Sequence, residues 1–252
     1  MRLTVVGCSG SYPGPDSPAS CYLVEADAAD GRTWRILLDL GNGALGTLHQ
    51  YADPLAIDAV FLSHLHPDHC LDLCGYYVLR KHHPDGARPR MPVWGPDGTA
   101  ERMARAYDLD PVPGMSEQFD FRAYDEPVEL GPFGVEAIRV DHPVPAYGLR
   151  VTAHGRTLAY TGDTGPCDAL QTLATGADLL LAEASFHHGR HNPPALHLTG
   201  REAGETATRA GVRRLVITHV PPWYSRDDMG AEAVAAFDGE VTLATSGRVL
   251  RV

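Results

Sequence analysis

The chain has 252 residues and carries 32 acidic against 21 basic side chains, which gives a formal net charge of −11. A protein that grips a long nucleic acid usually shows a basic stripe that displaces counterions from the phosphates, so this balance argues against an extended nucleic acid as partner. No run approaches the roughly 20 apolar residues that a membrane-spanning helix needs, and no membrane partner is expected.

The N-terminal segment MRLTVVGCSG predicts a first strand and a turn, without the pattern of a signal peptide. The cysteines form no CxxC pair and are typical of reduced thiols in a reducing compartment. They lie at Cys8, Cys21, Cys70, Cys74 and Cys167. Cys70 and Cys74 are interpreted as small apolar core residues and not as metal ligands. We therefore expect a cytoplasmic protein.

Short β-branched and apolar runs recur along the chain, with helical patterns between some of them. Strands are predicted for LTVVG, CYLVEA, WRILLDLG, AVFLSH, VEAIRVDH, YGLRVT, TLAYTGD, LLLAEA, RLVITH and VTLAT. Helices are predicted over 69–82, 97–108, 167–175, 199–211 and 229–237. Thr199 and Glu202 form the capping-box pattern of the fourth. The proline-rich segment 84–96 is expected to be a surface loop. Many short strands with turn-length gaps favour mixed sheets with helices outside, in a single domain over 1–252.

The stretch SHLHPDHC at 63–70 is the densest group of metal-binding side chains in the chain. His64, His66, Asp68 and His69 follow a buried-strand pattern that ends at residue 62. One metal ion cannot take all four with sound angles. Two neighbouring ions can, if His64 and His66 serve one and Asp68 and His69 serve the other.

Three further apolar strands end in a side chain that could complete these two sites. They end at His142, Asp163 and His219, and Asp163 lies in the glycine-flanked turn TGDTG, where a carboxylate could bridge two ions. The predicted sets are His64, His66, His142 and Asp163 for one ion, and Asp68, His69, Asp163 and His219 for the other. Positions remain for water and substrate, which indicates a catalytic site. The nitrogen and oxygen ligands favour two zinc ions, with manganese or iron as alternatives.

The segment HLHPDH at 64–69 resembles the HxHxDH signature of the metallo-β-lactamase superfamily, and the later His, Asp and His match its remaining metal positions in order. The resemblance covers nearly the whole chain. It implies an α/β (α+β) fold, a four-layer αββα sandwich with the dinuclear site at one edge. Because the superfamily includes lactamases, thioesterases and phosphodiesterases, the fold does not choose the reaction.

Two residues outside the cluster indicate the branch. Glu183 in AEASF and His197 in HLT resemble the ribonuclease Z branch, in which a glutamate supports a histidine that protonates the leaving oxygen. A carboxylate partner would raise the pKa of His197 and orient it as a general acid. Two metals would hold a hydroxide and clamp the phosphoryl oxygens, while Asp68 steers the hydroxide proton. Phosphodiester hydrolysis suits these parts.

Longer segments are similar to those of actinobacterial, mycobacterial-type cyclic-nucleotide phosphodiesterases. They are VVGCSGSYPGPDSPAS, SHLHPDHCLDL, AYTGDTGPCD, PPALHLTGREAG and THVPPWYS. The similarity implies that this chain is a metal-dependent hydrolase of a small phosphodiester. The implied substrate is a 3′,5′-cyclic nucleotide, with cyclic AMP as the first candidate, and the product is the 5′-monophosphate. It also implies a homodimer, by analogy with relatives of this branch.

Two other reactions stay open. A ribonuclease Z that processes tRNA 3′ ends carries an arm commonly inserted between the positions of His142 and Asp163, where this chain has only 20 residues. A thioesterase or lactamase would leave Glu183 and His197 without a role. The side chains of Trp223 and Tyr224 either stack on a purine or pack within the protein. His187, His188 and His191 are placed at the entrance without a ligand role.

Overall fold

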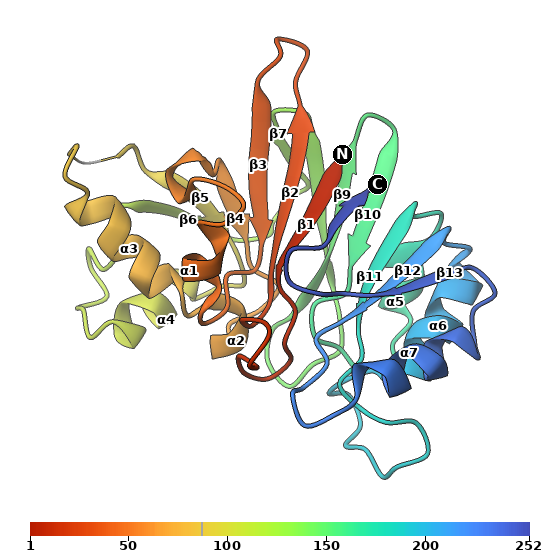
Figure 1. Cartoon of the computed structure of the whole chain (residues 1–252). Helices are drawn as coiled ribbons and strands as arrows, with labels where there is room; N and C mark the ends of the chain where they lie inside the picture. The colour runs from red at the N-terminus through yellow and green to blue at the C-terminus, as the bar shows by residue number, and fades with distance from the viewer. Residues whose placement is uncertain (87) are drawn as a thin grey trace.

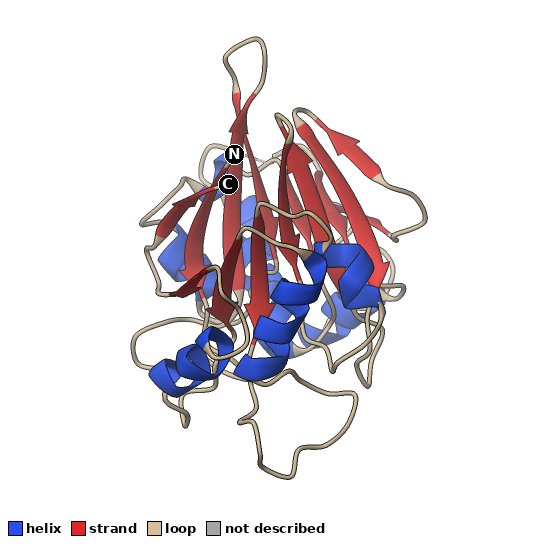
Figure 2. Ribbon diagram, turned by 90° about the vertical axis from the view of Figure 1, so that its right-hand side faces the viewer, coloured by secondary structure: helices blue, strands red, loops and turns tan. Residues whose placement is uncertain are grey.

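Two seven-stranded sheets lie face to face in this computed structural model, which describes residues 1–86 and 88–252. Helices cover both outer faces, so the layers run helix, sheet, sheet, helix (Figure 1). Figure 2 shows the two sheets nearly edge-on, with strands running in a similar direction. The expected αββα sandwich of the α/β class is confirmed.

The first sheet comes from the N-terminal half of the chain, joined by the last strand. Its order is β14-β1-β2-β3-β4-β5-β6, antiparallel from β14 to β3 and parallel from β3 to β6. The bounds are β1 Arg2–Gly7, β2 Cys21–Asp27, β3 Thr33–Leu38, β4 Ala59–Phe61, β5 Met91–Trp94, β6 Phe119–Arg122 and β14 Val249–Arg251.

The second sheet has the order β13-β12-β11-β10-β9-β8-β7, parallel from β13 to β10 and antiparallel from β10 to β7. The bounds are β7 Val128–Leu130, β8 Phe133–Arg139, β9 Tyr147–Ala153, β10 Arg156–Tyr160, β11 Leu179–Glu183, β12 Arg214–Thr218 and β13 Glu240–Leu243. Because β8, β10, β11 and β12 share one direction, their carboxyl ends meet at one edge of the sandwich.

The helices pack on the outer face of the sheet from which they emerge. On the first sheet lie α1 Ala44–Leu48, the 3-10 turn η1 Pro54–Ala56, α2 Pro67–Cys70, α3 Leu73–His82 and α4 Thr99–Ala106; on the second lie α5 Ala169–Ala174, α6 Gly200–Ala210 and α7 Arg226–Val234. The apolar faces of both sheets enclose a central core that includes Tyr22, Phe61 and Tyr160. This burial is the main term that holds the two sheets together.

Three local predictions were wrong in their boundaries. The segment 84–96 is not all loop, because Met91, Val93 and Trp94 are buried in β5 between β4 and β6. The helix predicted over 69–82 is divided into α2 and α3, where the backbone N–H of Asp72 donates to the carbonyl of Leu40. The last helix starts earlier, at residue 226, because Ser225 caps it through the N–H of residue 228.

Other boundaries followed the prediction closely. The capping box of α6 is present, with the Thr199 hydroxyl accepting from the N–H of Glu202 and the Glu202 carboxylate accepting from Thr199.

Among the residues described, the longest helix has 11 residues, and none of the helices combines the length and apolar character needed to cross a membrane.

Candidate metal centre

The loop that follows β4 carries four of the predicted ligands. His64 and His66 alternate along its extended part, and α2 begins at Pro67, which brings Asp68 and His69 into its first turn. Proline suits this position because a helix leaves its first N–H groups unpaired. A hydrogen bond fixes the start of this loop: the N–H of Ser63 donates to the carboxylate of Asp39, which follows β3, at 2.6 Å.

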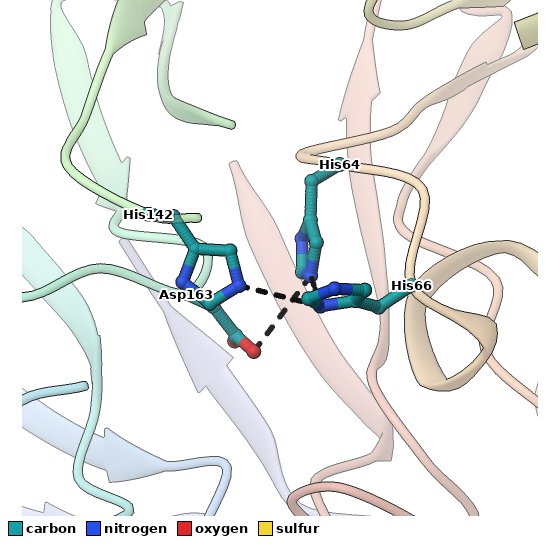
Figure 3. Close-up of side chains that lie close together, drawn as sticks. All are labelled: His64, His66, His142 and Asp163. Atoms are coloured by element: carbon teal, nitrogen blue, oxygen red, sulfur yellow. Dashed lines mark hydrogen bonds and ion pairs between the residues drawn. The ribbon is translucent and has the colours of Figure 1, made fainter. Parts of the chain in front are cut away.

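The first cluster contains His64, His66, His142 and Asp163, which converge as Figure 3 shows. Nδ1 of His66 lies 2.9 Å from Nε2 of His64 and 3.3 Å from Nε2 of His142. Oδ2 of Asp163 lies 3.8 Å from Nε2 of His64. All four ligand atoms lie within 4.8 Å of one another, a spacing that can bind a metal ion.

The second cluster contains Asp68, His69, Asp163 and His219, all buried. Nε2 of His69 lies 3.1 Å from Nε2 of His219, and Oδ2 of Asp68 lies 3.1 Å from Nε2 of His219. Oδ1 of Asp163 lies 3.2 Å from His69 and 3.4 Å from His219, measured to Nε2 in both cases. The seven residues predicted from the sequence therefore lie together, in the two sets predicted.

Asp163 joins the two clusters because its carboxylate oxygens face different sides. Oδ2 is directed to His64 and Oδ1 to His69 and His219. Its Oδ1 is fully buried and makes no hydrogen bond to any residue that the structure describes. An ionised carboxylate oxygen buried in this way is costly unless a cation satisfies it. The donor set therefore fits divalent metal ions, held by nitrogen and oxygen atoms.

A glycine makes the approach of Asp163 possible. Gly162 has a positive φ of 58°, which side chains rarely adopt, and a Cβ there would come within 2.9 Å of the side chain of Ser63. The turn after β10 therefore packs directly against the loop after β4. This contact brings the ligand loops of the two sheets to the same place.

Hydrogen bonds at the far ring nitrogen orient three of the histidines. Nδ1 of His142 lies 2.9 Å from the carbonyl of Leu196, and a carbonyl can only accept, so the proton is assigned to Nδ1. The Ser185 hydroxyl lies 2.9 Å from Nδ1 of His219 and donates to the His219 carbonyl, so it accepts from that ring. Each arrangement leaves Nε2 unprotonated and directed at the cluster, as a metal ligand must be.

Asp39 orients the third histidine and was not among the predicted site residues. It is fully buried, and its Oδ2 accepts from Nδ1 of His69 at 2.7 Å and from the Tyr160 hydroxyl at 2.7 Å. The Ser63 hydroxyl donates to the same oxygen at 2.8 Å. A signal was present in the sequence, because Asp39 directly follows the apolar residues ILL within WRILLDLG, at the end of a predicted strand.

The protonation states follow from burial and neighbouring charge. Burial lowers the pKa of His142 to about 4, and burial also lowers the pKa of His64, so both rings are neutral and able to bind metal. Burial opposes the charged form of His69, but the carboxylates of Asp163, Asp39 and Asp68 outweigh it and raise its pKa. A metal ion bound to His69 would therefore have to displace a proton from it.

Glu183 and His197 form a separate pair beside the clusters. Nδ1 of His197 lies 2.9 Å from Oε1 of Glu183 and 4.0 Å from Oδ2 of Asp163. Glu183 ends β11 and is fully buried, and Thr164 donates its N–H to the same oxygen at 2.8 Å. Burial disfavours the imidazolium, but the charge and hydrogen bond of Glu183 outweigh it and raise the pKa of His197 to about 9.

The remaining histidines and aromatic residues lie outside the clusters. His187 contacts Glu232 through Nδ1 at 3.2 Å and packs its ring on Tyr224 at 4.6 Å between centroids. His188 and His191 are exposed, and among the described residues neither belongs to a group that could hold a metal. Trp223 is 57% exposed and packs against Tyr12, with ring centroids 5.4 Å apart.

Comparison with known proteins gives a consistent result. Residues 34–220 match the family described as the β-lactamase superfamily domain, a segment that contains all seven clustered residues. An uncharacterized protein of Mycobacterium leprae is 46% identical over 257 residues, covering 100% of this chain and 89% of that protein. The expected similarity to mycobacterial proteins is thereby confirmed.

Two relatives have more informative names. The probable metallo-hydrolase YhfI of Bacillus subtilis is 31% identical, over 99% of each chain. The crystal structure of YhfI, a metallo-β-lactamase fold protein, aligns with a TM-score of 0.87 at 30% identity, over 99% of this chain and 98% of that one. Ribonuclease Z of Haloarcula marismortui is 29% identical over 307 positions, covering 100% of this chain and 97% of that protein.

Proposed function

The chain belongs to the metallo-β-lactamase superfamily and is a metal-dependent hydrolase, and from this premise we propose that it is a phosphodiesterase. Its substrate is a 3′,5′-cyclic nucleotide, with cyclic AMP as the first candidate, and its product is the 5′-monophosphate. The metal ligands are the seven clustered residues, and the ions are two divalent cations, zinc before manganese or iron.

The observation that carries the proposal is the Glu183–His197 pair. The Nδ1 proton of His197 is engaged by Glu183 at 2.9 Å, so the Nε2 proton of the imidazolium remains available for donation. Its raised pKa of about 9 keeps His197 protonated at neutral pH. Hydrolysis of a phosphodiester needs such a donor because an alkoxide is a poor leaving group. The leaving group of a thioester is a stable thiolate, which has less need of a proton donor.

The residues divide the work as follows. Bound divalent ions would supply charge stabilisation to the phosphoryl oxygens and lower the pKa of the nucleophilic water. Asp68, whose pKa is lowered by the charges of His69 and His219 in spite of burial, stays ionised and orients the water by accepting a hydrogen bond from it. A P–O bond forms to the oxygen of this water, which loses one proton to the solvent. The bond from phosphorus to the 3′ oxygen breaks, and His197 gives its proton to that oxygen.

Ribonuclease Z activity is the second candidate, favoured by the relative of that name. Against it stands the segment between His142 and Asp163, in which β9 and β10 form a hairpin turned at residues 154–155. The alignment with the Haloarcula protein spans 307 positions, to which this chain contributes 252 residues. The chain is thus shorter than that relative, and its net charge of −11 does not favour tRNA.

A substrate panel tests the proposal on the purified, metal-loaded protein. We expect turnover of cyclic AMP and bis-p-nitrophenyl phosphate, and no cleavage of a thioester, a β-lactam or a tRNA precursor with a 3′ trailer. Release of the trailer at a rate above that of cyclic AMP hydrolysis would assign the chain to ribonuclease Z activity instead. Thioester or β-lactam turnover alone would reject a phosphodiesterase.

A substitution tests the proton donor. His197→Ala should lower the rate on cyclic AMP by about 10²–10⁴-fold, the usual contribution of a general acid, with metal content unchanged. The matched control is His82→Ala, which removes an exposed histidine at the end of α3 and should change neither quantity. Full activity of His197→Ala on cyclic AMP would show that another group supplies the proton.

A further inference from the structure

A pocket of about 300 Å³ lies beside His66 and reaches beyond the seven clustered residues. Three segments line it: the loop between β4 and α2, the loop after β5 with α4, and the loop after β8. Most of its wall is apolar, formed by Leu65, Val144 and three prolines, and the carboxylate-bearing Asp97 also lines it. Its volume is at the lower end of the roughly 300–1,000 Å³ found for small-molecule sites.

The pocket and the metal centre share two stretches of backbone. Leu65 and Pro67 line the pocket and alternate in sequence with His64, His66 and Asp68, which belong to the clusters. On the other side, the pocket residues 144 and 145 follow the cluster histidine at 142 after one intervening residue. A molecule bound at the clusters therefore has an apolar space directly next to it.

One cation faces this apolar space. Arg102, on α4, lines the pocket, and its guanidinium makes no hydrogen bond or ion pair with the residues described, which are all but residue 87. A half-buried guanidinium without a protein partner retains its five donors for a ligand.

We propose that this pocket receives the base of the nucleotide whose phosphate lies at the metal centre, with Arg102 donating to an acceptor atom on the edge of the ring. The inference rests on the proposed function and specifies which part of the substrate the chain recognises. A base has apolar faces that suit the walls of Val144 and the prolines. Its edge carries lone pairs, such as N7 of a purine, that suit an arginine.

Two other occupants fit the pocket less well. An apolar acyl or alkyl group would fill the same walls but would leave the Arg102 guanidinium without a partner at a cost in free energy. A second phosphate would satisfy Arg102, but it would have to shed water against walls that offer few other donors. A base meets both demands, because it combines apolar faces with a polar edge.

The test compares two ligands that share a phosphate and differ in the base. Dissociation constants of 5′-AMP and ribose 5-phosphate are measured by titration calorimetry on the metal-loaded protein. We expect 5′-AMP to bind about 10–100-fold more tightly, the effect of one charge-assisted hydrogen bond with apolar burial. Because both ligands place a phosphate at the metal centre, their ratio cancels any change in metal affinity.

Substitutions in the pocket then show which residues cause the difference in affinity between the two ligands. Arg102→Met and Val144→Asp should each bring the ratio of the two dissociation constants close to one. The control is Arg105→Met on the same helix, where the wild-type side chain is exposed and paired with Glu101, and it should preserve the ratio. Circular dichroism and metal content establish that each variant is folded and loaded.

Three results would overturn the inference. They are equal binding of the two ligands by the wild type, a ratio unchanged in Arg102→Met, and tighter binding of ribose 1,5-bisphosphate than of 5′-AMP, which would identify a second phosphate site. The proposed function fails separately, by absence of cyclic AMP and bis-p-nitrophenyl phosphate hydrolysis. A protein that hydrolyses both but binds the two ligands equally would keep the function and lose the base pocket.

Discussion

Oε1 of Glu183 lies 2.9 Å from Nδ1 of His197, and this contact joins the end of β11 to the loop before α6. The second oxygen of Glu183 is buried without a hydrogen-bond partner among the described residues. The negative charge of Glu183 therefore acts mainly on His197 and stabilises the imidazolium form of that histidine.

Glu183→Gln should move the alkaline limb of the pH profile to lower pH. In the wild type the pKa of His197 is about 9, so the donor is protonated below that pH and activity falls as pH rises through it. Glutamine removes the charge that raises this pKa and leaves burial, which lowers it. A kcat profile on cyclic AMP over roughly pH 6–10 measures the limb.

A substrate with a better leaving group provides the control for this prediction. Bis-p-nitrophenyl phosphate releases a stable phenolate and has less need of a proton, so Glu183→Gln should affect it less than cyclic AMP. The same alkaline limb in variant and wild type would mean that His197 does not titrate in the reaction.

Asp163→Asn should release metal from both clusters. The two carboxylate oxygens face His64 on one side and His69 with His219 on the other, and an amide loses the charge and offers only one oxygen. We expect bound metal to fall below about half of the wild-type content, measured by elemental analysis after desalting. Asp168→Asn, at an exposed carboxylate near the same turn, should keep its metal; retention of both ions by Asp163→Asn would refute the bridging role.

Asp39→Asn should weaken metal binding although Asp39 touches no predicted ion. The Asp39 carboxylate accepts from Nδ1 of His69 at 2.7 Å and fixes that ring. Loss of such a partner typically costs about 10–100-fold in metal affinity, which competition with a chelator measures. Tyr160→Phe removes a different bond to the same oxygen and should cost about 1 kcal/mol of unfolding free energy with metal affinity retained. Equal effects on metal affinity would contradict this separation.

Metal binding should release a proton, and its affinity should rise with pH. The carboxylates around His69 raise its pKa despite burial, so the metal-free protein keeps that proton at neutral pH. Affinity then rises about tenfold per pH unit for one released proton and levels off above the pKa of His69. Calorimetric titration in buffers of different ionisation enthalpy counts the protons. A count of zero would show that His69 is neutral before the metal arrives.

All seven clustered residues could be predicted from the sequence, although three of them lie far from the others in the chain. His64, His66, Asp68 and His69 are neighbours in the chain, and a strand followed by a proline-initiated helix is enough to direct them to one region. The later ligands were found because each ends an apolar strand. That they serve as ligands stays a prediction until metal is measured.

Other features were decided by contacts distant in the chain. The role of Asp39 was decided by the pairing of β3 with β4, which places its carboxylate 2.7 Å from Nδ1 of His69. The strand β5 was missed because MPVW is short and contains a proline, and pairing with β4 and β6 overrides that weak local preference.

By itself, the sequence predicted mixed sheets with helices outside and the grouping of the candidate ligands, because hydrophobic periodicity and strand-end placement are local properties of the chain. The αββα sandwich followed from the resemblance of HLHPDH to the superfamily signature. Only the tertiary structure decided that the two oxygens of Asp163 face different clusters, and that Arg102 faces a pocket beside His66. The physical reason is that such relationships depend on how two sheets pack against each other. Packing sets distances between atoms far apart in sequence, which no local pattern encodes.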